Sequence, residues 1–458
     1  MRFKLMSLAI AISCTAGTHV SAAVSPEEAG QLGDSLTLWG AVQAANEDGT
    51  IPAYTGGIGA PASYDPARPG IRPDPYADET PVLVIDASNY LDHKERLTTA
   101  SIAMFEKYPD FRMEIYPSHR TARYPEFYLQ NAVRNATSCE TGENGLRLVN
   151  CYAGTPFPIP RAGIEAMWNQ FMKYSGAAYK IEDVRSTVVD RRGTIMNTMF
   201  QGQWNQYPIW ANPPEGVLKG DEVHEMIYND YTGPARKSGE KLVLHDSLDM
   251  ASNPRRAWSY LPGQRRVKLA PDVAHDTPSS TAAGIGTVDD SMVFYGSFER
   301  FDWELVGKQE VYLPYNMFKL YDKDHACNQD QVVLTKSFMN PECVRWELHR
   351  AWVVQATLKE GSRHIYPKRT FYWDEDLLGV GMSVNYDSSG AAYRVVQSES
   401  IPKYEKYGHN SGAFVTHDLA SGAYARQAYS NGDSGVVDIE PLPSRFFSPQ
   451  SLSGGGVR

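Results

Sequence analysis

Four arginines around one tight turn are the first residues whose type and spacing could do chemistry. Arg255 and Arg256 precede a Pro-Gly turn at 262–263, and Arg265 and Arg266 follow it. A guanidinium group pairs with a phosphate or carboxylate through two parallel hydrogen bonds. The pattern therefore indicates contact with anionic lipid headgroups or with an acidic partner surface. An ion-paired or solvated turn explains the same residues equally well.

Arg350 is a charged residue on an otherwise apolar strand face. In residues 345–358 the even-numbered side chains are apolar, and Arg350 alone interrupts them. A buried arginine needs an ionic partner or a route to water. One interpretation is an internal ion pair. The other is that this face lines a hydrophobic cavity and that Arg350 receives the polar head of a bound lipid.

Large apolar side chains of one parity, on three expected strands, are candidates for the wall of such a cavity. A lipid pocket needs mainly apolar and aromatic walls with few polar groups. Ordinary core packing explains the same residues as well, and a shift of one residue in register would turn every one of them to the opposite face. The candidates are Met196, Phe200, Trp204, Trp258, Tyr260, Trp346 and Trp352.

The familiar catalytic motifs are missing from the sequence. It has no G-x-S-x-G elbow, no H-E-x-x-H, no P-loop and no Rossmann glycine fingerprint. The adjacent acids at 289–290 and 374–376 are interpreted as turn residues or as partners of nearby arginines, because glycosidase chemistry needs two acids on facing elements. We therefore predict no catalytic residue, no metal site and no cofactor.

The elements that position these residues change in kind along the chain. Apolar spacing predicts helices over 34–47, 86–108 and 123–136, and a further helix after the proline at 160. From 178 to about 397, alternating segments separated by Gly, Pro and Asp turns predict about a dozen strands. So many strands in one block indicate a single large antiparallel sheet or an incomplete barrel. The structure of the tail from 404 onward is left open.

The N-terminus and the charge balance bear on compartment and partner. Arg2 and Lys4, an apolar run and small residues up to Ala23 predict a secretory signal peptide, with lipidation at Cys14 as a weaker alternative. No later segment reaches the ~18 apolar residues of a membrane-spanning helix. The formal net charge of −10 without a long basic run argues against nucleic acid.

Four cysteines follow the expected signal peptide and form two local pairs. In an oxidising compartment the spacing favours Cys139 with Cys151 and Cys327 with Cys343. Four cysteines allow three connectivities, and proximity in sequence selects one only as an expectation. Zinc is disfavoured because no Cys-x-x-Cys spacing occurs.

Six ordered runs resemble a bacterial family described as domain of unknown function 1329. They are DGTIPAYTGG from Asp48, FPIPRAGIEAMWN from Phe157, RRAWSYLPGQRRV from Arg255, TVDD from Thr287, DWELVGKQEVYLPYN from Asp302 and RHIYPKRTFYWDED from Arg363. The resemblance implies a relationship to the lipoprotein-sorting carriers LolA and LolB, whose curved sheet and covering helices enclose a hydrophobic cavity. It also implies a Gram-negative envelope protein with an inner-membrane transporter of the resistance-nodulation-division type and an outer-membrane protein as partners.

The pattern and the resemblance together predict an α+β fold. We expect a large curved antiparallel sheet, an unclosed half-barrel, lidded by helices. Its parts are a signal peptide at 1–23, a helix- and loop-rich N-terminal segment at 24–151 packed on the main unit, and the half-barrel with its lid helix at 152–458.

The expected function is that of a periplasmic carrier or binding accessory protein. It would hand a lipid, fatty acid or sterol-like molecule between membrane components, and it would sit in the periplasm or peripherally at the outer membrane. An envelope hydrolase or lipid-modifying enzyme, and a structural adaptor of a transporter, are the alternatives.

Overall fold

One large, unclosed sheet dominates the computed structural model, which describes residues 23–271, 273–430 and 435–454. Neighbouring strands are antiparallel, apart from a short parallel contact between β2 and β12. Fourteen strands follow in spatial order, and β11 and β18 pair at its side. Their bounds in that order are β1 (Leu83–Asp86), β2 (Arg112–Ile115), β12 (Arg345–Leu358), β13 (Lys368–Asp374), β14 (Gly381–Tyr386), β15 (Ala392–Pro402), β16 (His409–Asp418), β17 (Ala423–Tyr429), β5 (Ala178–Val189), β6 (Ile195–Gln206), β7 (Val223–Gly233), β8 (Lys241–Ser247), β9 (Arg256–Leu261) and β10 (Arg266–Leu269), with β11 (Phe301–Pro314) beside β12 and β18 (Val437–Asp438) beside β5.

The helices are short and lie around this sheet. The α-helices are α1 (Pro26–Ala29), α2 (Thr99–Lys107), α3 (Glu126–Ser138), α4 (Gly163–Phe171), α5 (Pro208–Ala211), α6 (Asp330–Val333) and α7 (Ser451–Gly454). The 3₁₀ turns are η1 (Tyr90–Arg96), η2 (Glu143–Gly145), η3 (Pro262–Gln264), η4 (Ser280–Ala282), η5 (Val288–Asp290), η6 (Phe318–Leu320), η7 (Ala326–Asn328), η8 (Pro341–Cys343) and η9 (Ser444–Phe447), and a separate two-stranded sheet joins β3 (Glu140–Gly142) to β4 (Arg147–Val149). Within the described ranges, every helix is too short or too polar to cross a bilayer.

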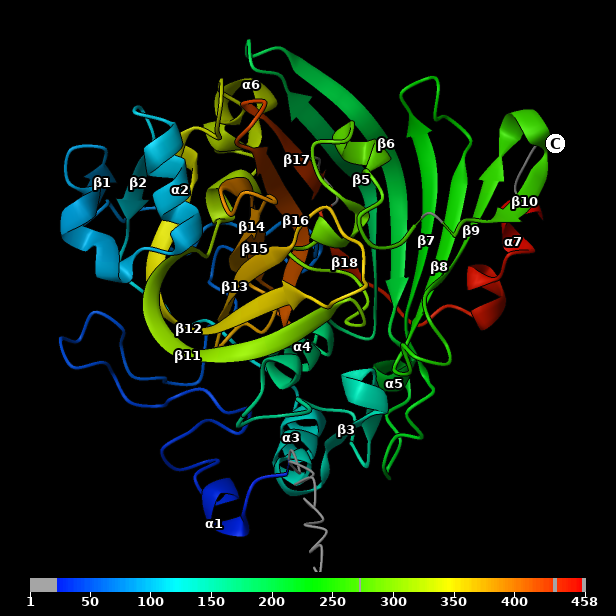
Figure 1. Cartoon of the computed structure of the whole chain (residues 1–458), viewed down its shortest axis with the longest axis horizontal. Coiled ribbons are helices and arrows are strands. Elements are labelled where there is room, and N and C mark those ends of the chain that lie inside the picture. Colours follow the sequence, from blue (N-terminus) through cyan, green and yellow to red (C-terminus); the bar gives the residue numbers. More distant parts are fainter. Residues whose placement is uncertain (1–22, 272, 431–434, 455–458) are drawn as a thin grey trace, which may run out of the picture.

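The sheet curls because its long strands carry register shifts. Bulges interrupt the β5–β6 and β6–β7 ladders, and another interrupts the β15–β16 ladder. A bulge bends its strand and increases the local right-handed twist. The resulting curve turns from β11 and β12 through β17 to β10, as Figure 1 shows.

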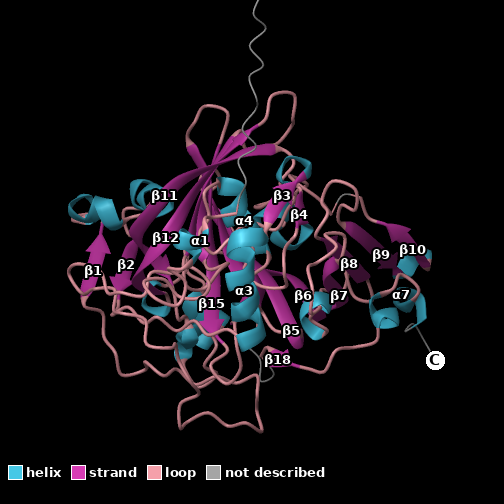
Figure 2. Ribbon diagram, turned by 90° about the horizontal axis from the view of Figure 1, so that it is seen from below, coloured by secondary structure: helices cyan, strands magenta, loops and turns pink. Residues whose placement is uncertain are grey.

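Two cores lie on the two sides of the curled sheet. The larger packs α3 and α4 with β5, β6, β11 and β13 and contains Trp168 and Trp373. The other packs α2 against β14 and β15. Figure 2 shows α3 and α4 in front of the middle of the sheet, while β7 to β10 curve away to one side.

The predicted strands and two of the helices are confirmed, but the N-terminal segment differs. Residues 34–47 form turns and isolated bridges rather than a helix. Gly40 explains this, because it has a φ of +97° and a Cβ there would overlap the carbonyl of Pro158. Residues 86–108 divide into the end of β1, η1 and α2, because the side chains of Asp86 and Asn89 close a turn.

Pairings in the tail and the N-terminal segment went unpredicted. The tail supplies β16, β17 and β18, and β17 joins β5 to the rest of the sheet. The N-terminal segment adds β1 and β2 at the other end. These additions take the sheet to sixteen strands, whereas the sequence pattern predicted about twelve.

Both predicted disulfides are confirmed. Cys139 bonds Cys151, and Cys327 bonds Cys343. The first ties the end of α3 to the chain after β4, and the second ties η7 to η8. The signal peptide and Cys14 lie almost wholly outside the described residues, which begin at 23.

Candidate ligand-binding pocket

A pocket of about 160 Å³ lies against the face of the sheet formed by β5 to β8. The segment between β10 and β11 forms its other wall; we call residues 273–295 of this segment the covering loop. The covering loop contains only the 3₁₀ turns η4 and η5. The expected helical lid is therefore a loop at this pocket, while α4 packs on β11 and β12.

Part of the pocket wall is apolar and comes from both sides. Ile227 of β7 and Leu244 of β8 form a cluster with Tyr295, and Val273 and Met292 of the covering loop pack on it. This cluster places aliphatic groups next to a tyrosine ring. It can hold a hydrocarbon group by excluding water from both.

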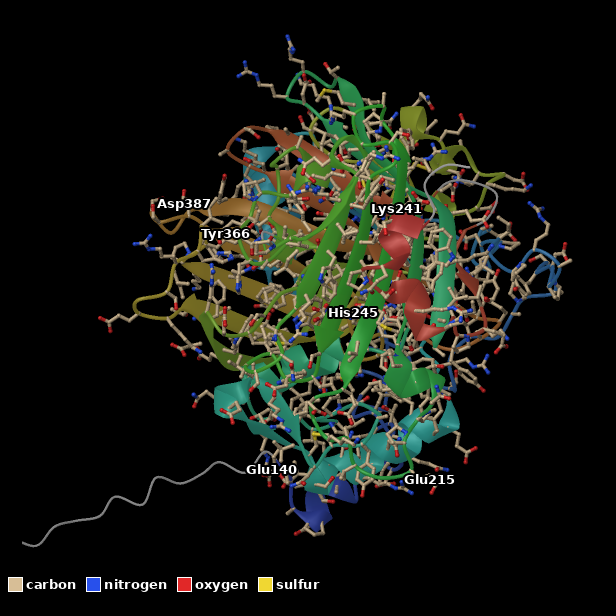
Figure 3. All side chains as sticks on the ribbon, turned by 90° about the vertical axis from the view of Figure 1, so that its right-hand side faces the viewer. Glu140, Glu215, Lys241, His245, Tyr366 and Asp387 are labelled. Atoms are coloured by element: carbon tan, nitrogen blue, oxygen red, sulfur yellow. A yellow bond between two sulfur atoms is a disulfide. The ribbon has the colours of Figure 1, made fainter. Side chains whose placement is uncertain are left out.

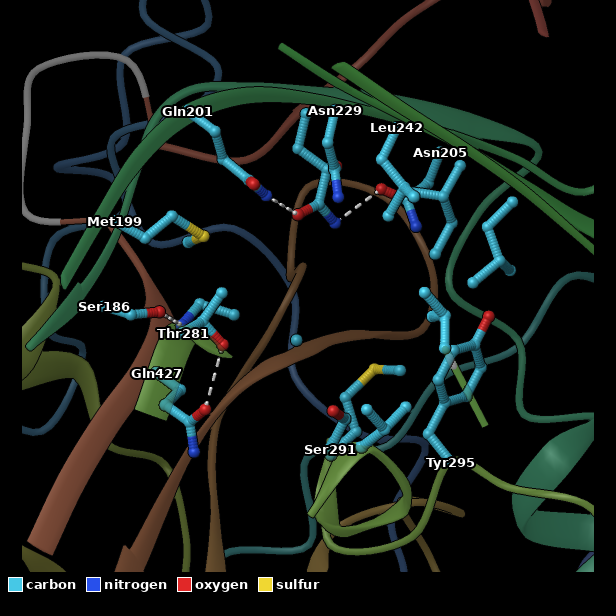
Figure 4. A pocket seen from close by; sticks show the side chains of 18 of the residues that line it. Ser186, Met199, Gln201, Asn205, Asn229, Leu242, Thr281, Ser291, Tyr295 and Gln427 are labelled. Atoms are coloured by element: carbon cyan, nitrogen blue, oxygen red, sulfur yellow. Dashed lines mark hydrogen bonds between the residues drawn. The ribbon is translucent and has the colours of Figure 1, made fainter. Parts of the chain in front are cut away.

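The other part of the wall is a chain of amides along β6. Gln201 donates to Gln203 at 3.0 Å, and Gln203 donates to Asn205 at 2.8 Å. Asn205 donates in turn to Glu225, whose second oxygen accepts from the Tyr295 hydroxyl at 2.7 Å. Figure 4 shows Gln201 and Asn205 on one side of the pocket, with Ser291 and Tyr295 opposite. The pocket wall thus combines hydrogen-bonding amides with an apolar cluster.

Two buried oxygens in this wall have no hydrogen-bond partner among the described residues. They are Oε1 of Gln201 and Oδ1 of Asn229. A buried polar atom without a partner costs about 1–3 kcal/mol. Both residues line the pocket, so the two oxygens are acceptors available to a ligand that carries a hydroxyl or an N–H group.

Arg255 also lines the pocket, but its charge is balanced. It forms two hydrogen bonds with Asp246, at 2.7 and 2.8 Å, and donates a third to the backbone oxygen of Tyr295. Its guanidinium lies 4.0 Å from the Tyr295 ring centroid. Burial raises the pKa of Tyr295 well above its usual range, so its hydroxyl stays protonated at neutral pH. Arg255 therefore fixes the wall and does not belong to an exposed basic hairpin.

A buried ionic network anchors the covering loop to the sheet. Arg369 of β13 donates to Asp289, Asp290 and Asn385, each at 2.9 Å. His364 lies 3.0 Å from Asp289. Burial alone would raise the pKa of Asp289, but Arg369 and His364 lower it well below its usual range. The adjacent acids that the sequence suggested as arginine partners hold the loop in place.

Three of the predicted lining residues face away from the pocket. Trp204, Trp258 and Tyr260 pack in a cluster on the outer face with Phe446 and Phe447 of the C-terminal segment. Figure 3 shows that segment lying over the outer face beside His245. The strand parity assumed from the sequence is reversed here, because the larger aromatic residues serve the contact with the C-terminal segment.

The two remaining candidates on β6 also lie outside the pocket lining. Phe200 is half-buried, beside Gly233 and within 5.8 Å of the Arg185 guanidinium. Met196 is 44% exposed near the tip of the β5–β6 hairpin. Neither belongs to the pocket wall, which β6 builds with Met199 and the odd-numbered residues that follow.

The candidates on β12 are structural. Trp346 is buried in the core beside α2. The amino group of Lys308 lies over the Trp352 ring, 4.2 Å from the ring centroid. Arg350 lies 3.4 Å from Glu310 and 3.5 Å from Glu375. Its charge is therefore balanced by an internal ion pair, and it does not line this pocket.

The other three arginines of the predicted hairpin are exposed but not clustered together. Arg265 and Arg266 stand at the β9–β10 turn. Arg256 begins β9, opposite His245, five residues before the strand ends at Leu261. Five residues of strand span about 17 Å. Only Arg265 and Arg266 share one turn.

The amides of β6 are the functional candidates that the sequence interpretation missed. Gln201, Gln203 and Asn205 occupy alternate positions of the strand, so a polar face is visible as a pattern in the sequence. The sequence interpretation chose the opposite face, because large apolar side chains are the usual wall of a lipid pocket. The contribution of the covering loop has no periodic signal at all.

One group of described residues has the spacing of a metal site: His349, Asp374 and Asp376. Both oxygens of Asp376 already accept from Arg120, at 2.7 and 2.8 Å. Asp374 accepts from Tyr315 at 3.0 Å, and burial raises its pKa to about 7. All of these side chains are buried and outside the pocket lining, so the group is an ion-pair network of the core.

A second cavity, of about 420 Å³, lies at the β1–β2 end of the sheet. Its walls include Thr50, Pro52, Leu83, Ile115 and Tyr312. Among its described lining residues, no side-chain oxygen or nitrogen is buried without a hydrogen-bond partner. The hydroxyl of Ser118, for example, donates to the backbone oxygen of Leu348. It therefore lacks the unpaired acceptors that distinguish the pocket of β5 to β8.

Known proteins resemble this chain along most of its length. A Pseudomonas aeruginosa protein, "Uncharacterized protein PA3922", is 36% identical over 447 residues, which cover 96% of each chain. Two solved structures share 12% identity: a putative outer membrane lipoprotein-sorting protein domain from Vibrio parahaemolyticus, and a DUF1329 family protein from Desulfovibrio piger. The first covers 64% of this chain and 98% of its own, with a TM-score of 0.42. The second covers 63% and 97%, with a TM-score of 0.41.

The family assignment is more direct than these structural likenesses. The model of the family described as "Protein of unknown function (DUF1329)" matches residues 84–453, which include every strand of the large sheet except the first residue of β1. The resemblance found in the sequence is confirmed, and the chain belongs to the DUF1329 family.

Proposed function

We propose that this protein binds a hydrophobic molecule in the pocket between β5–β8 and the covering loop, and carries it across the periplasm. The observation that carries the proposal is the composition of the wall. An apolar cluster lies beside a chain of amides, and two buried acceptors, Gln201 Oε1 and Asn229 Oδ1, are unpaired. Sites for small molecules combine mostly apolar walls with a few placed polar groups.

The ligand class follows from the same wall. The unpaired atoms are acceptors, so the ligand supplies a donor such as a hydroxyl, a protonated carboxyl or an amide N–H. Arg255 is neutralised by Asp246, so the wall offers no free positive charge to an anion. A fatty acid in its protonated form, a fatty alcohol or a sterol-like alcohol fits better than a phospholipid headgroup.

The covering loop sets the size of the ligand. The pocket volume of about 160 Å³ is below the roughly 300–1,000 Å³ of typical small-molecule sites. A lipid-sized ligand therefore enters only if the covering loop moves away from β7 and β8. Such a movement would have to break the hydrogen bonds of Arg369 to Asp289 and Asp290, or leave that part of the loop in place.

The compartment is supported by the N-terminal signal pattern and by two disulfides, which persist in oxidising compartments. The family resemblance adds an inner-membrane transporter of the resistance-nodulation-division type and an outer-membrane protein as donor and acceptor of the ligand. These partners are part of the proposal.

Saturable binding of a fluorescent long-chain fatty acid tests the proposal. Leu242 lines the pocket and is half-buried, so Leu242→Trp fills the pocket. Val267 is half-buried on the outer face, so Val267→Trp adds the same ring away from the pocket. We expect one site per chain in the wild type and in Val267→Trp, and at least a tenfold weaker affinity in Leu242→Trp.

Two results would contradict this function. One is equal binding by both tryptophan variants, which would put the ligand elsewhere. The other is conversion of the fatty acid or of an ester analogue into a product, which would favour the envelope-enzyme alternative. Mass spectrometry of solvent extracts from natively purified protein would identify the ligand class.

A further inference from the structure

Three neighbouring hairpins bring their turns to one edge of the sheet. They are the turns after β5 (190–194), after β7 (234–240) and after β9 (262–265). Strands β5 to β10 pair in sequence order and antiparallel, so these three turns end on the same side. Figure 1 shows all three along the upper edge of the sheet. The β7 and β9 turns touch, since a Cβ at Gly239 would lie 3.1 Å from Pro262.

This edge is basic although the protein is acidic. Together with Arg266, which directly follows the third turn, the three turns contain six cationic residues and two acidic ones. The formal net charge of the whole chain is −10. Figure 3 places Glu140 and Glu215 at the opposite end of the molecule, while Lys241 lies toward the basic edge. The cationic residues are Arg191, Arg192, Arg236, Lys237, Arg265 and Arg266.

Most of these cations face water with little internal pairing. The side chain of Arg192 is 81% exposed and lies 3.5 Å from Asp190. Arg265 and Arg266 are exposed on the outermost hairpin. Lys237 is the more enclosed member, because it lies 3.9 Å from Glu240 and donates to Ser280. The edge therefore keeps most of its positive charge available to another surface.

Apolar side chains stand among the cations on the same edge. Ile195 is 39% exposed and Met196 is 44% exposed, directly after the β5–β6 turn. Basic groups interleaved with aliphatic ones suit the headgroup layer of a membrane, where cations meet phosphates and short apolar groups insert.

We propose that this edge docks the protein on an anionic phospholipid membrane. A specific protein partner normally meets a compact centre of aromatic or arginine anchors set in pockets. Here the apolar groups are aliphatic, and the charges are spread over three separate turns instead of surrounding one pocket. These features favour a lipid surface over an acidic protein.

The docking edge lies next to the proposed ligand pocket. Ser280, which accepts from Lys237, precedes Thr281, and Thr281 lines the pocket. Thr281 also accepts from Thr198 of β6 through its backbone oxygen. Membrane contact at the β7 turn would therefore occur beside one end of the covering loop. The proposal about docking does not depend on the identity of the ligand.

Co-sedimentation with lipid vesicles tests the docking edge. Purified protein is mixed with vesicles of phosphatidylglycerol and phosphatidylcholine, or of phosphatidylcholine alone, at low and at physiological salt. We expect binding to the anionic vesicles only, weakened by salt. Each basic residue near such a surface contributes about a fivefold gain in binding. The variant Arg265→Glu/Arg266→Glu should therefore bind at least tenfold more weakly.

A matched control separates this edge from net charge. Lys94 and Lys107 are exposed on η1 and α2, away from the three turns, so Lys94→Glu/Lys107→Glu makes the same change in total charge. We expect the control variant to bind vesicles within twofold of the wild type. An equal loss in both variants, or no binding of the wild type to anionic vesicles, would overturn the proposal. An acidic protein partner would produce the second of these results.

Leu242→Trp keeps the two proposals distinguishable. It should lose fatty-acid binding and retain vesicle binding, whereas Arg265→Glu/Arg266→Glu should retain fatty-acid binding in solution. Retention of circular dichroism and of the urea midpoint shows that each variant is folded. Loss of vesicle binding in Leu242→Trp would contradict docking through the three turns.

Discussion

Replacing Arg369 should release the covering loop from the sheet. The side chain of Arg369 is 0% exposed, and it donates three hydrogen bonds of 2.9 Å to Asp289, Asp290 and Asn385. Arg369→Met keeps much of the apolar stem and removes the charge. It leaves two carboxylates, at 2% and 0% exposure, with His364 as the remaining basic neighbour of Asp289.

The expected magnitude follows from that geometry. Removing one partner of a buried ion pair costs about 3–5 kcal/mol, because the other charge stays buried without compensation. Two carboxylates lose the same cation here, so we place the loss of unfolding free energy in the upper half of this range. Adding Asp289→Asn and Asp290→Asn to Arg369→Met should recover part of the loss, since neutral amides cost less to bury than charges.

Urea unfolding at pH 7 and hydrogen exchange measure the effect. We expect a lower urea midpoint and faster exchange at the amides of Val288 and Asp289, which donate within the covering loop to Thr277 and His275. Arg266→Met on the exposed hairpin is the control and should change stability by less than about 0.5 kcal/mol. A loss below about 1 kcal/mol, or unchanged exchange in the loop, would refute the anchoring role of Arg369.

Three further predictions test other parts of the structure. Cys327→Ser should lower the unfolding free energy by about 3 kcal/mol in urea, because its bond to Cys343 closes a loop of about 16 residues; the same value with and without reductant in the wild type would contradict this. Burial alone would raise the pKa of Glu347, but Arg345 more than offsets it and lowers the pKa to about 2. The contribution of the ionised Glu347 carboxylate to the unfolding free energy is complete above the unfolded pKa of about 4.5 and is lost as the pH falls toward 2. Glu347→Gln should therefore reduce the change in unfolding free energy over that pH window by about 3 kcal/mol. Trp204→Ala should destabilise the protein by about 2 kcal/mol in urea and leave fatty-acid affinity unchanged, because the ring lies on the outer face.

The sequence predicted the kind of fold because strand alternation is a local signal. Residues 178–397 show it clearly, and the strands β5 to β15 begin in that range, although two long connections, at 270–300 and 315–344, contain no strand among their described residues. The helix expected at 34–47 failed because the constraint is distant: the Cβ-free Gly40 packs on Pro158. Local apolar spacing contains no information about such a contact.

The candidate site was harder to predict, since both faces of β6 alternate equally well. Trp204 and Gln203 are neighbours, and only the fold decides that Gln203 faces the pocket while Trp204 meets Phe446. The covering loop depends on Asp289 meeting Arg369, eighty residues later in the chain. Pairings of that range cannot be derived from spacing.

The position of the bound ligand tests the central claim most directly. A fatty acid with a photoreactive diazirine on its chain would be bound to the protein, activated by light, and located by peptide mass spectrometry. We predict labels on peptides that contain 199–205, 227–231, 242–244 and 288–295, lost when unlabelled fatty acid competes. Labels confined to the second cavity, at 49–52, 82–83 and 115–118, would contradict the claim that the pocket under the covering loop is the binding site.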